Sequence, residues 1–256
     1  MDNSNSKQER RPKGHIGAMA TNFLHLRNPY TIAWWSAAFP GFGYISLGSY
    51  VIGFLLFFWE VLINTKAGVN TAILYSFIGE FAKAKEVLNT KWLLLYAPVY
   101  FFSIWGSYRL AVSLNELSIL ADRRNAVVQP INISTIEINS LNNRIPWVSV
   151  AWTLLVPGLG HLYTHRIPTA FFLLVWWVGI CYFSNFFPAA HASVLGDFTS
   201  AKTTLDMQWL IYLPSIYGFA AYDVYANTVE YNRLFAKEQA RFLEKEYQAN
   251  EFEMPV

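Results

Sequence analysis

The sequence has few charged residues and one cysteine. Charged residues make up 14% of the chain and hydrophobic residues 54%, whereas soluble domains carry about 25% charge. The single cysteine, Cys181, excludes an internal disulfide, and its apolar surroundings predict a small buried filler rather than a reactive thiol. A net charge of +2 provides no whole-molecule case for nucleic-acid binding. These features exclude a disulfide-stapled scaffold and a strongly basic nucleic-acid-binding protein.

The few charges are segregated along the chain. Residues 29–59, 92–108 and 168–196 contain no Asp, Glu, Lys or Arg. A soluble helix needs a polar face and would show charges at helical spacing. Fully buried strands of an α/β core are the soluble alternative, but the length of the runs and their few turn signals disfavour it. We therefore expect these runs to be helices surrounded by lipid or by other apolar helices.

The chain aligns with itself at an offset of 117 residues. Without a gap, residues 27–117 match residues 144–234 at 23 of 91 positions, including Trp, Pro, Gly and polar positions in one register. Shared hydrophobicity alone does not produce such matches. We predict two copies of one membrane unit.

Each copy contains three apolar segments, about 31–47, 50–64 and 92–112 in the first copy and 147–163, 167–187 and 209–229 in the second. Pro-Gly-x-Gly follows the first helix of each copy, and it removes a backbone donor and supplies flexible φ values. The predicted hairpin-turn residues are Pro40, Gly41, Gly43, Pro157, Gly158 and Gly160. The predicted fold is an all-α integral membrane protein, a tandem duplication of a three-segment unit (hairpin plus third helix) with about six transmembrane helices.

Composition divides the chain into five parts. They are a basic cytoplasmic segment (1–27), membrane repeat 1 (28–117), a polar linker (118–143), membrane repeat 2 (144–232) and an amphipathic cytoplasmic helix and tail (233–256). Six crossings would place the linker outside, and four crossings with re-entrant hairpins would place it inside. Both arrangements leave 14 of the 19 basic residues in the cytoplasm, so the positive-inside rule does not choose. We predict a multi-pass cell-membrane protein with both termini cytoplasmic, and six crossings from the lengths of 147–163 and 167–187.

The ionisable residues in apolar segments are Glu60, Arg109 and Asp223, and such residues are functional hypotheses in membranes. Each lies toward an end of its segment, so the sequence predicts no charge deep inside a span. Asp223 and Arg109 are expected to pair if the third helices pack together. His161 and His165 have the i, i+4 spacing of metal ligands, but no third ligand is evident, so they are weak metal candidates.

The C-terminal stretch is predicted to continue the last span as a helix. Its basic residues recur every fourth position as Arg233, Lys237, Arg241 and Lys245. One interpretation is contact with anionic lipid headgroups, and the other is a solvated helix balanced by three glutamates. No catalytic residue, cofactor site or nucleotide fingerprint is predicted.

The segments 40–48 and 157–163 carry a Pro-Gly-x-Gly motif, followed in the second copy by Tyr163 and in the first by Gly48 and Gly53. At these residues the chain resembles TM2-like hairpin membrane domains of bacteria. The first copy has Ser46 where that pattern has Tyr. The resemblance covers about 30 residues per copy, implies a two-helix membrane module and brings no catalytic residues.

Three functions are compatible with these features. The first is a scaffold or partner-binding subunit of the bacterial cytoplasmic membrane, which contacts the lipid bilayer and a membrane partner or a second copy. The second is a channel or facilitator for an uncharged solute, built on the two repeats. The third is a lipid-modifying enzyme, for which His161, His165 and Asp223 are the nominees.

Overall fold

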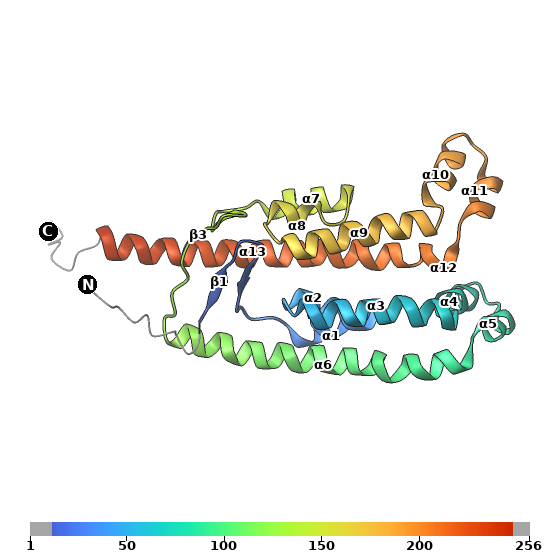
Figure 1. Ribbon diagram of the computed structural model, residues 1–256, viewed down its shortest axis with the longest axis horizontal. Coiled ribbons are helices and arrows are strands. Elements are labelled where there is room, and N and C mark those ends of the chain that lie inside the picture. Colours follow the sequence, from blue (N-terminus) through green and yellow to red (C-terminus); the bar gives the residue numbers. More distant parts are fainter. Residues whose placement is uncertain (1–11, 248–256) are drawn as a thin grey trace.

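A computed structural model describes residues 12–247 of the chain. Helices make up 72% of it, which confirms the mostly helical class. The strands form two short antiparallel pairs: β1 (Gly14–Ile16) with β2 (Thr21–Phe23), and β3 (Ile131–Ile133) with β4 (Ile138–Ser140). The molecule is elongated, and its long helices lie along the longest axis (Figure 1).

The helices of the two halves follow one pattern. In the first half they are α1 (Pro29–Ala38), α2 (Phe42–Ser46), α3 (Tyr50–Ala67), α4 (Val69–Phe77), α5 (Phe81–Val87) and α6 (Thr90–Arg123). In the second half they are α7 (Pro146–Leu155), α8 (Leu159–Tyr163), α9 (Ile167–Phe183), α10 (Phe186–Val194), α11 (Phe198–Thr204), α12 (Met207–Leu210) and α13 (Tyr212–Tyr247). The bounds of α7, α8, α10 and α11 differ from those of α1, α2, α4 and α5 by 117 residues at both ends.

Each Pro-Gly-x-Gly motif ends a short helix and turns the chain back on it. Gly41 and Gly158 have φ angles of +101° and +107°, which disfavour any residue with a Cβ. A Cβ added at Gly160 would lie 2.1 Å from the backbone oxygen of Ser149, and Gly43 has an equivalent close contact. The second short helix therefore packs directly on the backbone of the first.

These turns make the first segments shorter than the sequence predicts. The segment 147–163 is predicted to be long enough to cross despite its Pro-Gly break, but 31–47 and 147–163 each consist of a ten-residue helix and a five-residue helix that fold back on each other. Ten helical residues rise about 15 Å, whereas a hydrocarbon core is about 30 Å thick. Neither α1 nor α7 is long enough to cross a bilayer.

A buried cluster of aromatic rings fills the space where the two halves meet. The rings of Phe42 and Phe219 stack with their centroids 4.1 Å apart, and Phe57 meets Phe172 edge-on at 4.7 Å. Phe39 stacks on Phe57 at 4.4 Å. Such offset and edge-on pairs add to the free energy gained by burying their area.

Three segments far apart in the sequence meet at one end of the molecule. The Lys13 ammonium lies 2.9 Å from one carboxylate oxygen of Asp122, and the Lys237 ammonium lies 2.8 Å from the other. The side-chain amides of Asn132 and Asn139 donate to the backbone oxygens of residues 16 and 17 at 2.7 and 2.9 Å. We call residues 12–28, 118–145 and 230–247 the polar cap; β1, β3 and the far end of α13 lie together there in Figure 1.

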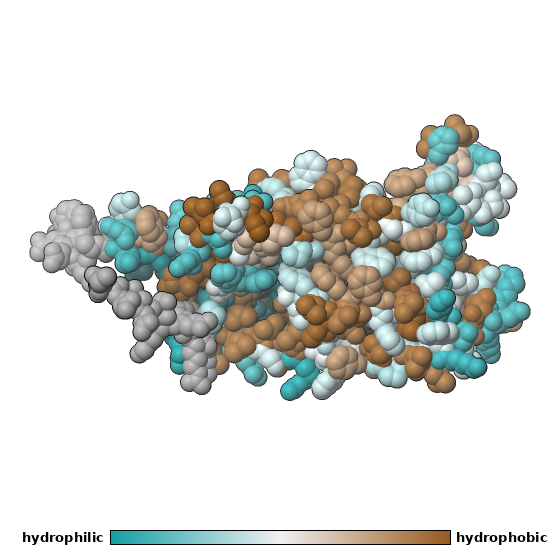
Figure 2. Space-filling model, viewed as in Figure 1, coloured by the Kyte–Doolittle hydropathy of each residue, from teal (hydrophilic) through white to brown (hydrophobic). Residues whose placement is uncertain are grey.

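Large apolar side chains cover much of the remaining surface. On α3 and α9 the most exposed are Val51, Leu55, Phe58, Leu62, Phe171, Val175, Val178 and Tyr182, each with more than half of its surface accessible. Figure 2 shows hydrophobic residues over most of the length between the two ends of the molecule. By length and hydropathy, α3 is the one helix within residues 12–247 that suffices to span a membrane unaided, and α9 joins it if the 63° bend into α10 is counted as one broken span.

Candidate functional site

Arg27 is held in place by its backbone at the junction of the polar cap and the first half. The side chain of Asn115, on α6, accepts from the Arg27 N–H at 2.9 Å and donates to the Arg27 carbonyl at 2.7 Å. Asn28 then caps α1, and Pro29 occupies the first helical turn, where a missing N–H costs nothing. We call this pair of hydrogen bonds between an asparagine side chain and an arginine backbone the Asn–Arg clasp. Because it uses only the backbone of Arg27, the guanidinium is free to donate to Ser46 at 2.8 Å and to Asn227 at 2.7 Å.

The second half repeats the clasp but not the side-chain environment. Asn232 accepts from the Arg144 N–H at 2.9 Å and donates to its carbonyl at 2.6 Å. The Arg144 guanidinium lies over the ring of Tyr163, 5.3 Å from its centroid, a cation–π arrangement. Tyr163 stands at the position that Ser46 occupies in the first half. The two arginines are thus equivalent in backbone and different in what their guanidinium groups contact.

A buried ionic cluster lies beside Arg27. Asp223, on α13, has no exposed surface; Arg166 donates to its Oδ2, and His161 Nε2 lies 3.2 Å from the same oxygen. Asn227 donates to Asp223 Oδ1 at 2.9 Å and accepts from Arg27. The sequence predicts no charge deep inside a span; within the protein, however, Asp223 and Arg166 form a buried ion pair, so the partner of Asp223 is Arg166. Arg109, its predicted partner, is exposed on α6.

The equivalent positions in the first half carry no charge. They are Tyr44, Ser49 and Gly106 where the second half has His161, Arg166 and Asp223. A Cβ added at Gly106 would lie 2.0 Å from the Tyr44 hydroxyl, so Tyr44 occupies the space beside the glycine. In the first half the Tyr44 side chain packs into this space, and in the second half the Arg166–Asp223 ion pair occupies it.

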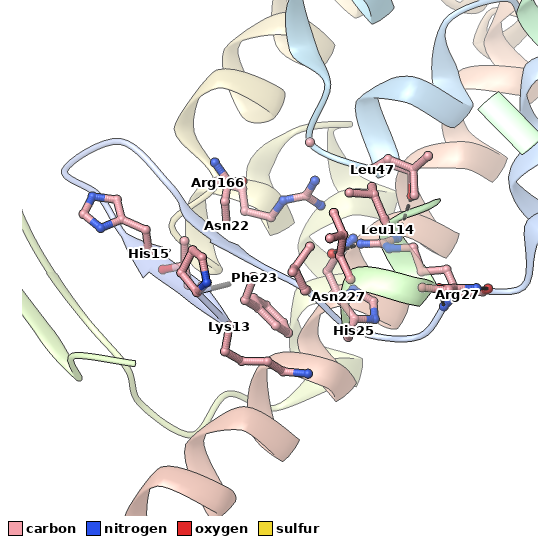
Figure 3. Close-up of a pocket in the computed structure, with 18 residues that line it drawn as sticks. Lys13, His15, Asn22, Phe23, His25, Arg27, Leu47, Leu114, Arg166 and Asn227 are labelled. Carbon is pink, nitrogen blue, oxygen red and sulfur yellow. Dashed lines mark hydrogen bonds between the residues drawn. The ribbon is translucent and has the colours of Figure 1, made fainter. Parts of the chain in front are cut away.

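A cavity of about 440 Å³ opens between the polar cap and the helices, and we call it the Arg27 cavity. The side chains that line it include three cations, Lys13, Arg27 and Arg166, and no carboxylate among residues 12–247. Figure 3 shows Arg27, His25 and Asn227 together on one side of it, with Lys13, which directly precedes β1, at another. The apolar part of its lining is Phe23, Leu24, Leu47, Leu114 and Leu117.

His25 lines the Arg27 cavity with unused hydrogen-bonding capacity. Its side chain is 9% exposed, and neither ring nitrogen has a hydrogen-bond partner within the described part of the chain. Burial, and then the charge of Arg27, lower its pKa from 6.5 to about 3. The imidazole is therefore neutral at physiological pH, and one of its two nitrogens carries a proton.

Glu60 belongs to a separate polar network at the opposite end of the helices. It is buried on α3 and accepts from Asn64 at 2.9 Å, while its Oε2 has no partner. Gln208 of the second half donates to Asn64 at 2.9 Å and accepts from the Thr71 N–H at 2.9 Å. This network joins α3 and α4 to α12, so its geometry is that of a contact between the two halves.

The structure separates the two histidines proposed as weak metal ligands. His161 lies in α8 beside Asp223, whereas His165 follows the end of that helix with φ +56° and contacts the carbonyl of Ala18 at 2.8 Å. Within residues 12–247, no group of three His, Cys, Asp or Glu side chains is placed to hold a metal ion.

Three of the four basic residues on the C-terminal helix contact groups within the protein. Arg233 donates to Glu230, Lys237 to Asp122, and Arg241 to Glu238 and the carbonyl of residue 126. Lys245 is exposed. Headgroup contact by this stripe stays a prediction, and residues 1–11 and 248–256 of the two terminal segments lie outside the described residues.

Sequence reasoning missed Arg27, Arg166, His25 and Asn227. Arg27 and Asn115 recur at the 117-residue offset as Arg144 and Asn232, which signalled a shared backbone role. The sequence signal for Arg166 and Asn227 was that each differs from the residue 117 positions earlier. A scan against family models, a search of curated proteins and a search of solved structures each gave no match.

Proposed function

We propose that this chain is an integral membrane protein of the bacterial cytoplasmic membrane that serves as a scaffold or partner-binding subunit. The observation that carries the membrane placement is the exposed apolar surface of α3 and α9. Contiguous apolar patches of this extent mark surfaces that water does not cover in the functional protein. The polar cap is the cytoplasmic surface offered to a partner.

We propose four crossings, by α3, α6, α9 and α13, with α1–α2 and α7–α8 as re-entrant pairs. At 34 and 36 residues, α6 and α13 are long enough to cross, although they are less apolar than α3. Support comes from the ion pairs of the polar cap, since Lys13 and Lys237 each lie within 3 Å of Asp122, and the three residues cannot lie on opposite sides of a core about 30 Å thick. The six-crossing arrangement would separate them. Irregular backbone at the Pro-Gly turns is tolerable at this depth because the turns are buried in protein.

The other two functions have less support. A facilitator needs a path between the halves, and the aromatic cluster of Phe39, Phe42, Phe57, Phe172 and Phe219 fills that space. For a lipid-modifying enzyme, the nominees His161 and Asp223 have no exposed surface. We also propose, from the equal spacing of elements in both halves, that the chain arose by duplication of a TM2-like hairpin unit with a third helix.

A matched pair of substitutions tests the membrane placement. Leu55 on α3 and Val127 in the polar cap are similarly exposed, at 65% and 60%. Leu55→Asp places a charge in hydrocarbon, which costs about 2.5–3.5 kcal/mol near the centre of a span, so we expect much less protein in washed membranes. Val127→Asp places the charge in water and should leave the yield unchanged. Equal yields for both variants would contradict the proposal.

The scaffold role is tested separately by purification of the full chain in mild detergent. We expect a second polypeptide, or a second copy, at fixed stoichiometry. A monodisperse monomer with no associated chain would contradict this role and leave the membrane placement standing.

A further inference from the structure

We propose that the Arg27 cavity binds the phosphate of an anionic phospholipid, with Arg27 as the principal contact and the apolar lining beside the glycerol and acyl chains. The inference rests on the proposed membrane placement, which brings lipid headgroups to the level of the cavity. Its own support is the charge, the hydrogen-bonding capacity and the position of the cavity.

The charge of the cavity favours an anion. Lys13 is paired with Asp122 and Arg166 with Asp223, whereas the contacts of the Arg27 guanidinium are the neutral groups of Ser46 and Asn227. No ion pair of Arg27 occurs within residues 12–247. A buried or half-buried cation with no carboxylate in direct contact is costly, and a phosphate that accepts hydrogen bonds from the guanidinium fork would relieve that cost.

His25 provides a second, independent indication of a ligand. Its two ring nitrogens are buried and make no hydrogen bond within residues 12–247, and the Glu230 carboxylate lies 3.9 Å from Nδ1. Buried polar atoms in proteins nearly always have a partner, and an unpaired group calls for an explanation such as a bound ligand. A phosphate oxygen beside Arg27 would accept from the neutral imidazole.

The position of the cavity suits a lipid rather than a purely soluble ligand. Ser46 and Gly48 line it immediately before α3 begins, and Arg166 lines it immediately before α9 begins. In the proposed arrangement these are the cytoplasmic ends of two spans, where headgroups lie. The leucines at 24, 47, 114 and 117 provide apolar surface for the part of a lipid next to its phosphate.

The repeat supplies the control for the test. Arg144 has the same backbone clasp as Arg27, but its guanidinium lies over Tyr163 and it does not line the cavity. Arg27→Gln and Arg144→Gln therefore remove the same group from equivalent positions. Asn22→Asp is a second variant, because Asn22 is an exposed residue at the cavity and an added carboxylate there repels an anion without disturbing the clasp.

The experiment measures the Kd of the purified full chain in neutral detergent by calorimetry. The probes are short-chain phosphatidylglycerol, phosphatidylcholine with the same chains, and glycerol phosphate. We expect phosphatidylglycerol to bind most tightly. Arg27→Gln should weaken it about 10- to 100-fold, the usual effect of losing hydrogen bonds to a charged group. Asn22→Asp should also weaken it, and Arg144→Gln should leave its Kd unchanged.

Two results would overturn the inference: equal loss in the two arginine variants, or no preference for phosphatidylglycerol over phosphatidylcholine. Glycerol phosphate binding as tightly as the lipid would overturn the lipid source and identify a soluble phosphate ester. Unfolding midpoints of each variant without ligand separate lost binding from lost folding. Failure of lipid binding together with normal membrane insertion would refute this inference alone.

Discussion

Arg27 and Arg144 have the same backbone contacts and different side-chain surroundings. Each is clasped by an asparagine of the long third helix, Asn115 or Asn232. One guanidinium then lines a cavity and the other stacks on Tyr163. The difference arises at the neighbouring position, where Ser46 is too small to cover Arg27. At the residue scale, the two halves share the backbone contacts of the arginine and differ in the groups around its guanidinium.

His25 gives the protein a predictable response to acid. Its folded-state pKa is lowered to about 3 by burial and by Arg27, with Arg166 and Lys13 acting in the same direction. The unfolded chain takes up this proton near pH 6.5, while the folded protein stays neutral. The free energy of unfolding therefore falls as the pH drops from about 6.5 toward 3, by up to about 1.4 kcal/mol per pH unit.

The variant His25→Phe tests this assignment. The new ring retains the contact with Phe23, whose centroid lies 5.1 Å from that of His25, and cannot be protonated. We expect the unfolding midpoint in detergent to fall less between pH 7 and pH 5 in the variant than in the wild type. The nearest carboxylate, Glu230, lies 3.9 Å from His25 Nδ1, so identical pH profiles would indicate that this carboxylate stabilises the imidazolium.

The sequence located the ionisable residues of the interior better than their partners. Asp223 was identified from its place in an apolar segment, yet Arg109 was chosen as its partner because both lie near helix ends. The actual partner, Arg166, belongs to the loop between α8 and α9. The 117-residue offset shows which positions of the two halves are equivalent. It does not show which residues become neighbours in space after the chain folds back. The chain reversal at Gly158 is what brings Arg166 next to Asp223.

At the scale of elements, the Pro-Gly motifs predicted helix ends but not helix direction. Pro40 and Pro157 were expected to kink or end a helix, and the helices α1 and α7 do end just before them. What composition does not give is the close packing of α8 on α7. In that contact Gly160, which has no Cβ, lies against the backbone oxygen of Ser149. Which backbone atom lies opposite a glycine depends on the folded structure and cannot be read from composition.

Gly160→Ala should therefore destabilise the protein. The added Cβ would meet the backbone oxygen of Ser149, and overpacking of this kind costs about 1–3 kcal/mol or more. Gly179→Ala is the matched control, because Gly179 lies within α9 and a Cβ there meets nothing within 4 Å. We expect the unfolding midpoint to drop for the first variant and to stay or rise for the second. A midpoint unchanged by Gly160→Ala would contradict the close packing.

At the scale of the whole molecule, the two ends have different characters. The polar cap joins the N-terminal segment, the linker and the last helix by ion pairs and hydrogen bonds, while α4, α5, α10 and α11 form the opposite end (Figure 1). The sequence predicted the duplication and the number of segments but left the side of the linker open. Contacts between residues more than 100 positions apart, such as those of Asp122 with Lys13 and Lys237, support the side that we propose, and no local pattern encodes them.

Labelling of single cysteines from either side of the membrane tests the four-crossing arrangement most directly. In a chain whose Cys181 is replaced by Ala, one cysteine is placed at Asn125, Lys83 or Ser200, all exposed. With four crossings, an impermeant maleimide added to intact cells labels positions 83 and 200 and reaches 125 only after permeabilisation. Labelling of 125 but not 83 in intact cells, with 200 labelled in either case, would require six crossings and contradict the account.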